Sequence, residues 1–264
     1  MCDSAPGLPE LQEDERLDRV NEQICLIQKK RGLTFGTDAF LLAAFIKRAP
    51  RAKAVELGGG TGIISLLLAS KRKAQEITAI EVQPAFSELI DRNAKLNRLD
   101  SVVKTLCMDL REVTAEALNG EVDLVFSNPP YMRTDSGKRN TEDQKYIARH
   151  EVCGTVFDFC AAAGRLLRYG GKFVCVWRPD RLSELMDAMQ RARLEPKRMT
   201  MVHADLSAEP CMVLIECIKG AAPSLRISPP LVLYQPRSTE DKQRTLTPEA
   251  QKIYDTCSFL NEDA

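Results

Sequence analysis

The stretch Glu56-Leu57-Gly58-Gly59-Gly60-Thr61-Gly62 decides the fold of this 264-residue chain. An acidic residue is followed by glycine at every second position, which gives the pattern E-x-G-x-G-x-G. An apolar run at 54–57 precedes it, and an apolar helical pattern at 63–70 follows it. Glycine permits positive φ and leaves no Cβ between the backbone and a ligand. The segment therefore predicts a strand, a tight turn that a ligand can approach, and a helix.

The same alternation of strand and helix continues downstream of this turn. Strands are predicted at 54–57, 77–80, 102–106, 122–126, 172–177, 198–203 and 211–217, and helices at 63–70, 84–96, 112–118, 156–167 and 181–192. Strands separated by helices indicate a parallel sheet covered on both faces. Only residues 204–210 separate the last two strands, so these should form an antiparallel hairpin at one edge. The expected fold is α/β, a doubly wound, mostly parallel, seven-stranded Rossmann-like sheet.

The ends of the chain differ in composition from its middle. Residues 1–15 are polar and contain Pro6 and Pro9, which predicts a disordered N-terminal segment. We expect one folded domain over 16–235, which includes a helix at 37–47 capped by Thr37. Residues 236–264 are charged and are predicted to form a loose C-terminal tail.

Composition excludes several classes of protein. No apolar run approaches the roughly 20 residues needed to span a bilayer, and the acidic N-terminus resembles neither a secretory signal nor a transit peptide. The nine cysteines are scattered without CxxC spacing, and only two histidines are present, so no metal site is expected. An odd number of scattered cysteines favours reduced thiols in a cytoplasmic protein. The oligomeric state cannot be read from the sequence.

Charge is balanced overall but not along the chain. Thirty-seven basic residues match thirty-seven acidic ones. Residues 1–22 are mainly acidic, whereas residues 29–53 carry seven basic side chains against one acidic side chain. The basic stretch could form a positive face that binds a polyanion, or it could be an ordinary solvated surface.

Acidic residues follow the predicted strands at the edge where ligands of open α/β sheets bind. The glycine offsets do not fit the dinucleotide fingerprint, in which glycines stand at positions zero, two and five. Glu56 precedes the loop, Glu81 ends the second strand, and Asp109 follows the third. Glu81 could accept both hydroxyls of a ribose, and Asp109 could accept a hydrogen bond from an adenine amino group. With Gly58, Gly60 and Gly62, these acids predict a cofactor site.

The turn Asn128-Pro129-Pro130-Tyr131 after the fourth strand is the most specific feature in the chain. A planar NH₂ group donates two hydrogen bonds, which the side-chain carbonyl of Asn128 and the backbone carbonyl of Pro129 can accept. Successive prolines fix φ and remove backbone donors, so local carbonyls stay free. Tyr131 can stack on a flat substrate. These four residues are the candidate catalytic residues, and Asn128 is also expected to border the cofactor.

These motifs carry a resemblance to a known class of enzymes. The glycine loop with Glu56 resembles the first motif of the class I S-adenosyl-L-methionine-dependent methyltransferases. The Asn128–Tyr131 turn resembles that of the N-methyltransferases of adenine, of protein glutamine and of some guanines. The resemblance implies S-adenosylmethionine as the cofactor and transfer of its methyl group to a planar nitrogen, without a dedicated base.

A narrower resemblance comes from the segment 33–43, Leu-Thr-Phe-Gly-Thr-Asp-Ala-Phe-Leu-Leu-Ala. It is similar to an element of the bacterial adenine N-methyltransferases that modify the adenine beside the anticodon of a valine tRNA. Segments 148–151 and 229–231 also resemble that family. The likeness implies a tRNA substrate, and it places Phe35 and Asp38 near the methionine end of the cofactor. Gly59 and Gly36 depart from the usual residues of the family.

Other substrates stay open at this level. The segment 132–151 is rich in basic residues and could close over a flipped base while contacting phosphates. A glutamine methyltransferase acting on a translation factor is disfavoured, because its relatives usually carry a helical domain before the glycine loop. An rRNA base methyltransferase is the remaining enzymatic alternative. A non-catalytic scaffold or RNA-binding module would predict a damaged loop or turn, and both are intact here.

Overall fold

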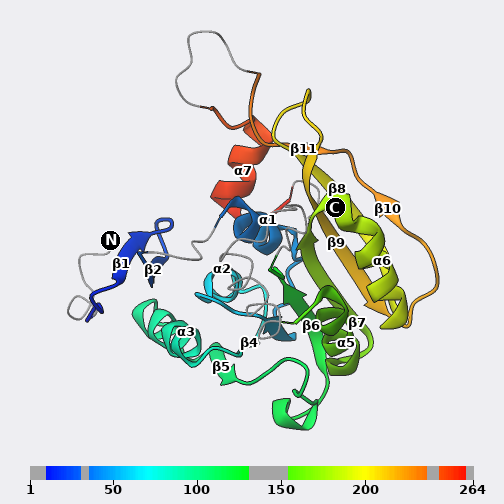
Figure 1. Ribbon diagram of the computed structural model, residues 1–264. Coiled ribbons are helices and arrows are strands. Elements are labelled where there is room, and N and C mark those ends of the chain that lie inside the picture. Colours follow the sequence, from blue (N-terminus) through cyan, green and yellow to red (C-terminus); the bar gives the residue numbers. More distant parts are fainter. Residues whose placement is uncertain (1–9, 31–35, 131–153, 237–243, 260–264) are drawn as a thin grey trace, which may run out of the picture.

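The computed structural model describes residues 10–30, 36–130, 154–236 and 244–259. The described strands form two sheets. One is a hairpin of β1 and β2, and the other is a nine-stranded sheet made of the remaining strands (Figure 1). The strands are β1 (Glu15–Arg19), β2 (Cys25–Lys29), β3 (Lys53–Leu57), β4 (Glu76–Glu81), β5 (Val103–Cys107), β6 (Val122–Ser127), β7 (Leu167–Trp177), β8 (Leu194–His203), β9 (Pro210–Lys219), β10 (Arg226–Ile227) and β11 (Leu231–Val232). The helices are α1 (Thr37–Phe45), α2 (Ile63–Ser70), α3 (Pro84–Leu96), α5 (Val156–Leu166), α6 (Leu182–Arg191) and α7 (Pro248–Thr256), with short 3₁₀ turns η1 (Glu116–Leu118) and η2 (Pro179–Arg181).

The order of the strands creates a switch point in the middle of the large sheet. Along the sheet they run β10-β8-β9-β7-β6-β3-β4-β5, and β11 also pairs with β8. The chain leaves β3 toward β4 and β5 on one side and returns to β6 and β7 on the other. Since β3 and β6 pair in parallel, the residues that follow both strands meet at the same edge. Ligands of open α/β sheets bind at such a point.

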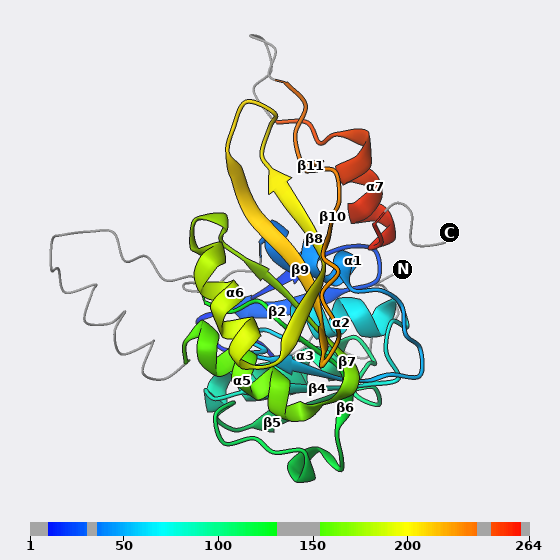
Figure 2. The same cartoon turned by 90° about the vertical axis from the view of Figure 1, so that its right-hand side faces the viewer.

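Successive side chains of the strands point to opposite faces of the sheet and pack into two separate hydrophobic cores. Ala54, Leu124 and Val174 point into one core, beneath α1, α2, α3 and α7, while Val55 and Val125 point into the other, beneath α5 and α6. Figures 1 and 2 show the two helical layers on opposite faces of the twisted sheet. The central strands are apolar on both faces, as expected when helices cover both sides.

The predicted sheet is confirmed, with local differences. All seven expected strands are present, and β8 and β9 form the expected antiparallel hairpin. The proline-rich segment after residue 220 adds two strands that were not predicted, β10 and β11, each of two residues. Such short pairings leave no periodic pattern in a sequence. The helix expected at 112–118 is reduced to η1, and β7 begins at Leu167, five residues before the strand expected at 172–177.

The segment predicted as a loose tail contains a packed helix. In α7 the side chains of Ala250 and Ile253 are buried, and the ring of Tyr254 lies 5.3 Å from that of Phe40 on α1. Residues 237–243 and 260–264 lie outside the described residues, as do residues 1–9 of the expected disordered N-terminal segment. The loose-tail prediction is therefore wrong for 248–256, because a short amphipathic helix among charged residues covers α1.

Helix α1 is held at its C-terminal end by two cations, the buried Lys73 and the partly buried Arg198. Its last carbonyls have no partner within the helix, and the ammonium of Lys73, 2% exposed, donates to the carbonyls of Ala43, Ala44 and Ile46 at 2.9, 3.1 and 2.6 Å. The guanidinium of Arg198 stacks 3.7 Å above the Phe45 ring. At the other end Gly36 is the N-cap residue and makes no side-chain hydrogen bond, so the predicted capping by Thr37 is wrong.

The hairpin of β1 and β2 is attached to α3 by side chains that replace a neighbouring strand. Asn93 accepts from the amide of Ile27 at 2.7 Å and donates to its carbonyl at 2.9 Å. Asn97 makes the same pair of hydrogen bonds with Cys25. Asn93 also donates to the carbonyl of Thr61 in the glycine loop. The hairpin, α3 and the loop are thereby joined through one buried side chain.

Among the described residues, no helix has the length and apolar character needed to cross a membrane.

Candidate active site

The glycine loop adopts the conformation that its sequence requires. Gly58, Gly60 and Gly62 have φ of 73°, 55° and 80°, a region that side chains other than glycine rarely adopt. Gly59 has no positive φ, but a Cβ there would lie 2.7 Å from Cδ1 of Ile90 on α3. Its glycine therefore allows close packing rather than a special φ. A Cβ at Gly60 would meet nothing within 4 Å, because that backbone faces open space.

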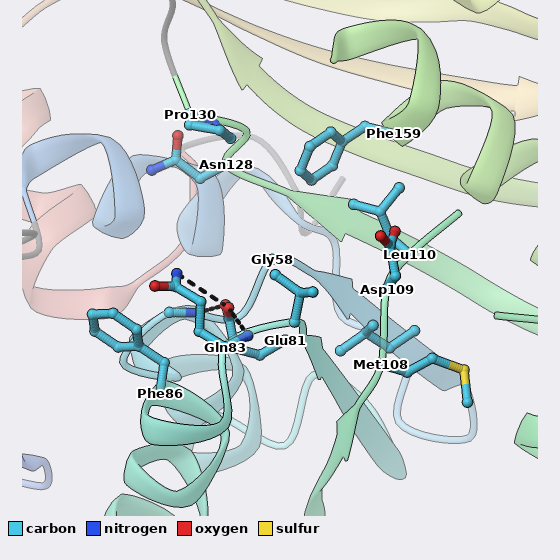
Figure 3. A pocket seen from close by; sticks show the side chains of 13 residues that line it. Gly58, Glu81, Gln83, Phe86, Met108, Asp109, Leu110, Asn128, Pro130 and Phe159 are labelled. Atoms are coloured by element: carbon cyan, nitrogen blue, oxygen red, sulfur yellow. Dashed lines mark hydrogen bonds between the residues drawn. The ribbon is translucent and has the colours of Figure 1, made fainter. Parts of the chain in front are cut away.

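That open space is a pocket at the switch point of the sheet. It has a volume of about 670 Å³ including its mouth. Figure 3 shows Asn128, Pro130 and Phe159 on one side, Glu81, Gln83 and Phe86 on the opposite side, and Asp109 with Leu110 at one end. The complete lining is Gly58, Gly60, Ile80, Glu81, Val82, Gln83, Phe86, Met108, Asp109, Leu110, Asn128, Pro130 and Phe159. A mostly apolar cleft with a few converging polar groups is typical of a cofactor site.

Glu81 is oriented by backbone amides. Its carboxylate is 5% exposed, and its two oxygens accept from the amides of Gly60 and Gln83, both at 2.9 Å. A carboxylate offers about four acceptor positions, so it keeps acceptor capacity for a hydroxyl donor in the pocket beyond its bonds to Gly60 and Gln83. The dashed lines in Figure 3 show this arrangement, with the hydrogen bond to the Gln83 side chain at 3.5 Å.

Asp109 lies at the end of the pocket beside two apolar side chains, Met108 and Leu110. Its carboxylate accepts from Arg111, and this hydrogen bond lowers the pKa of Asp109 below its ordinary value. Asp109 is thus held ionised as an acceptor at the wall of an apolar slot. That combination suits a flat ring with an amino group.

Glu56 does not line the pocket. It lies behind the loop, 1% exposed, where the hydroxyl and the amide of Ser65 donate to its carboxyl group. Burial raises the pKa of Glu56 from 4.5 to about 8. At neutral pH the residue is therefore mainly protonated, and it supports the junction of β3 and α2 from within the fold. The structure does not bring Glu56 to the pocket together with Glu81 and Asp109.

Asn128 and Asp38 meet at the edge of the pocket. Asn128 follows β6 and Asp38 stands in the first turn of α1, and the Nδ2 of Asn128 donates to the Oδ2 of Asp38 at 2.8 Å. The Oδ1 of Asn128 is buried and has no hydrogen-bond partner among the described residues. A buried acceptor without a donor costs about 1–3 kcal/mol. Such a group in a pocket calls for an external donor.

Several predicted residues cannot be placed. Phe35, Tyr131 and the segment 132–151 lie outside the described residues. The other predicted pocket residues, Gly58, Gly60, Glu81, Asp109 and Asn128, come together as expected, with Pro130 beside them. Asp38 joins them through Asn128, whereas Gly62 and Pro129 do not line this pocket.

Three other pocket residues could hardly be predicted from the sequence. Gln83 directly precedes the helix-opening Pro84, so its nearness to Glu81 could have suggested a place at the pocket. Phe86 and Phe159 lie in helices whose apolar pattern is equally consistent with core packing. Only the tertiary arrangement turns these rings toward the ligand space.

The described basic residues of the stretch at 29–53 do not border the pocket. Lys29 is in the N-terminal hairpin and pairs with Asp14 and Glu15. Lys47, Arg48 and Arg51 are exposed and directly precede β3, so they lie at the amino edge of the sheet, opposite the glycine loop. A continuous positive face around the pocket is therefore not formed by these residues.

His203 and Trp177 make contacts within the fold. His203 hydrogen-bonds the carbonyl of Ala208 in the β8–β9 hairpin, and Trp177 is 2% exposed and donates to the carbonyl of Arg181. No disulfide joins any two of the seven described cysteines, and the described part of the chain contains no cluster of side chains suited to a metal ion.

Comparison with known proteins now decides the family. The family described as methyltransferase small domain matches residues 30–193, more than half of the chain. The chain belongs to this family. The match runs from the end of the N-terminal hairpin through α6 and includes every described residue of the pocket.

Relatives with assigned functions share about a quarter of the sequence with this methyltransferase. A protein of Porphyromonas gingivalis named "tRNA1(Val) (adenine(37)-N6)-methyltransferase" is 29% identical over 187 residues, 69% of this chain and 72% of the relative. A protein of Bacteroides fragilis with the same name is 28% identical over 74% of this chain and 81% of its own. One from Trichodesmium erythraeum is 24% identical over 86% of this chain and 92% of its own.

Solved structures of other methyltransferases share the fold. A predicted O-methyltransferase from Agrobacterium tumefaciens superposes with a TM-score of 0.65 at 21% identity, covering 84% of this chain and 98% of that one. A 16S rRNA N2 methyltransferase from T. thermophilus, solved with AdoMet and guanosine, has a TM-score of 0.54 at 19% identity, covering 81% of this chain and 52% of that one. These similarities support the doubly wound architecture.

Proposed function

We propose that this methyltransferase transfers the methyl group of S-adenosyl-L-methionine to the exocyclic amino group of an adenine in tRNA, next to the anticodon of a valine tRNA. The names of the relatives, which span most of both chains, support the substrate. The observation that carries the chemistry is the buried Oδ1 of Asn128 at the pocket edge, which has no hydrogen-bond partner in the part of the chain that the structure describes. It is an acceptor placed for a planar amino group.

The pocket fits S-adenosylmethionine residue by residue. Glu81 keeps acceptor capacity for the ribose hydroxyls, and ionised Asp109 accepts from the adenine amino group between Met108 and Leu110. The backbone of Gly60 faces open space that a side chain would fill, which leaves room for the methionine portion. The cofactor supplies an electrophilic methyl group on a sulfonium sulfur. Phe35 is proposed to contact the methionine end.

The residues of the turn position the acceptor nitrogen. Asn128 accepts one hydrogen of the amino group through Oδ1, and the backbone carbonyl of Pro129 accepts the other. These two contacts hold the nitrogen lone pair in line with the transferring methyl group. Because the methyl donor is already activated, positioning supplies most of the catalysis, and the proton of the methylated nitrogen leaves to solvent. Tyr131 is proposed to stack on the target base.

The proposed partners and location follow from the same relatives. RNA is the proposed macromolecular partner, and neither a membrane nor a structural metal is part of the proposal. The proposed location is the cytoplasm. Transfer to a protein glutamine or to an rRNA base would use the same two acceptors. These alternatives are distinguished by the experiment that follows.

Mass spectrometry of nucleosides tests the proposal. Total tRNA and rRNA from cells with and without the gene are digested and compared, and the purified enzyme is then given the unmodified RNA with labelled S-adenosylmethionine. The expected result is loss of N6-methyladenosine from the tRNA fraction alone and its restoration in vitro. Loss of a methylated base from rRNA, or unchanged RNA in both fractions, would overturn it.

The variant Asn128→Ala tests the role of the turn. It should bind S-adenosylmethionine with nearly unchanged affinity by calorimetry, while turnover falls at least about 100-fold, because only the acceptor for the amine is removed. Loss of cofactor binding in this variant would contradict the assignment. Asp180→Ala, at the same edge of the sheet, provides the control.

A further inference from the structure

Asn128 is held by a residue 90 positions earlier in the chain. Asp38 lies in the first turn of α1, Asn128 follows β6, and the two side chains meet through the 2.8 Å hydrogen bond from Nδ2 to Oδ2. The pairing is not a local consequence of sequence. It requires α1 to lie against the sheet with its N-terminal end at the edge that carries the glycine loop.

The chemistry of the pair fixes which way the amide faces. A carboxylate has only acceptors, so the group of Asn128 directed at Asp38 must be its NH₂. The carbonyl is then directed away from Asp38, and Figure 3 shows this oxygen pointing toward Pro130. If the amide rotated by half a turn, it would place two acceptor oxygens against each other and present donors to the pocket. Such an amide would repel the hydrogens of an incoming amine.

We propose that Asp38 is a positioning residue for methyl transfer, which keeps the side-chain carbonyl of Asn128 directed at the substrate amine. This inference rests on the proposed function and adds a residue to it. Asp38 touches neither the amine nor the transferring methyl group in this role. It acts through Asn128.

Asp38 is itself held rigidly. Its Oδ1 accepts from the amide of Ala39 at 2.9 Å, and every residue of α1 from Ala39 to Phe45 is buried. Lys73 and Arg198 hold the opposite end of the helix, as described above. The carboxylate therefore belongs to a fixed element and not to a surface loop. A fixed partner is what an orienting hydrogen bond needs.

The carboxylate also strengthens the acceptor that it orients. A hydrogen bond from Nδ2 to a charged oxygen polarises the amide and increases the negative charge on Oδ1. During transfer the N–CH₃ bond forms as the S–CH₃ bond breaks. The sulfonium becomes a neutral thioether, and the amine nitrogen gains positive charge before it releases a proton to solvent. A more negative Oδ1 stabilises that developing charge.

A double-mutant cycle tests whether Asp38 acts through Asn128. The enzymes are the wild type, Asp38→Ala, Asn128→Ala and the double variant, with Asp38→Asn as a variant that keeps an acceptor without the charge. Asp180→Ala is the matched control, since Asp180 lines the same open groove as Asp38 but pairs with Arg178. For each enzyme kcat on unmodified tRNA and the S-adenosylmethionine Kd are measured.

The expected result is a loss in kcat without a loss in cofactor affinity. Asp38→Ala should lower kcat about 100-fold, the effect of misplacing one reacting group, with Kd changed less than about 3-fold. Asp38→Asn should lower kcat only about 10-fold, because its side-chain carbonyl can still accept from the Asn128 amide and orient it. The double variant should be no slower than Asn128→Ala, because Asp38 has no further route to the reaction.

Two results would overturn the inference. If the losses in kcat multiply in the double variant, Asp38 acts independently of Asn128. If Asp38→Ala weakens S-adenosylmethionine binding about 100-fold and leaves kcat unchanged, Asp38 is a cofactor ligand and not a positioning residue.

A substrate-free measurement separates this inference from the proposed function. In ¹⁵N-labelled protein the side-chain amide signal of Asn128, identified by its absence in Asn128→Ala, should move in Asp38→Ala and stay in place in Asp180→Ala. An unmoved signal in Asp38→Ala would overturn the pairing even if tRNA is methylated. A moved signal with no methylation of any RNA by the wild type would leave the pairing intact and refute the proposed function.

Discussion

Glu56→Gln should make the protein more stable at neutral pH and less dependent on pH. Burial raises the pKa of Glu56 from 4.5 to about 8 in the folded protein, so folding favours its protonated form. The stabilisation from this group is complete below pH 4.5, which is the pKa of the glutamate in the unfolded chain. It is lost as the pH rises toward 8. Glutamine has the shape of the protonated acid, keeps a carbonyl for Ser65, and cannot ionise.

The size of the effect follows from the same pKa. One pH unit of differential protonation corresponds to about 1.4 kcal/mol. Over the roughly 2.5 units from pH 4.5 to pH 7, the free energy of unfolding of the wild type should therefore fall by about 3 kcal/mol relative to the variant. Urea unfolding of both proteins at several pH values between 5 and 8 measures this difference, and groups that titrate alike in both proteins cancel.

Glu15→Gln provides a control of opposite sign. The Arg92 guanidinium lowers the pKa of Glu15 to about 2, so its stabilisation is present above pH 4.5 and is lost only as the pH falls toward 2. The difference in the free energy of unfolding between Glu15→Gln and the wild type should change at acidic pH and stay constant between pH 5 and 8. If the free energies of unfolding of the wild type and Glu56→Gln change in parallel from pH 5 to 8, the explanation of Glu56 as a buried protonated acid is refuted.

Further variants test the pocket and its supports. Glu81→Ala should weaken S-adenosylmethionine binding by about 1–3 kcal/mol in calorimetry, since charge-assisted hydrogen bonds to the ribose are lost; an unchanged Kd would contradict its role. Glu15→Gln should reduce the free energy of unfolding by up to about 3 kcal/mol at pH 7, a loss that denaturant unfolding should no longer detect near pH 2. Lys73→Met should cost about 2–4 kcal/mol in the same assay, because three buried carbonyls at the end of α1 lose their donor; full stability would show that water replaces the ammonium. The KM for tRNA should rise steeply with salt if cations contact its phosphates, and a salt-insensitive KM would favour a protein substrate.

Much of the fold could be predicted from local patterns. The E-x-G-x-G-x-G segment places a strand, a turn with positive φ and a helix in order, and all three occur at Lys53–Ser70. Because parallel strands end at one edge, acids that follow successive strands could be expected to converge, and Glu81 and Asp109 do so. The turn at Asn128 follows the strand next to β3 for the same reason.

What the sequence did not show depends on tertiary packing. Glu56 has the spacing of a ligand-binding acid, yet its side chain points into the fold because its position in β3 faces Ser65 of α2. The hydrogen bond between Asp38 and Asn128 joins elements that no periodicity connects. The two-residue strands β10 and β11 and the helix α7 gain their stability from the surfaces of β8 and α1. Local propensity alone could not reveal these.

The side chain of Asn93 has a consequence for motion. It bonds at once to the backbone of β2 and to the carbonyl of Thr61 in the glycine loop. Neither segment can separate from α3 without breaking buried hydrogen bonds, so the hairpin, the helix and the loop should open and close as one cooperative unit. A small molecule that holds the loop closed should thereby slow amide hydrogen exchange in the N-terminal hairpin, a part of the chain that lines no part of the pocket.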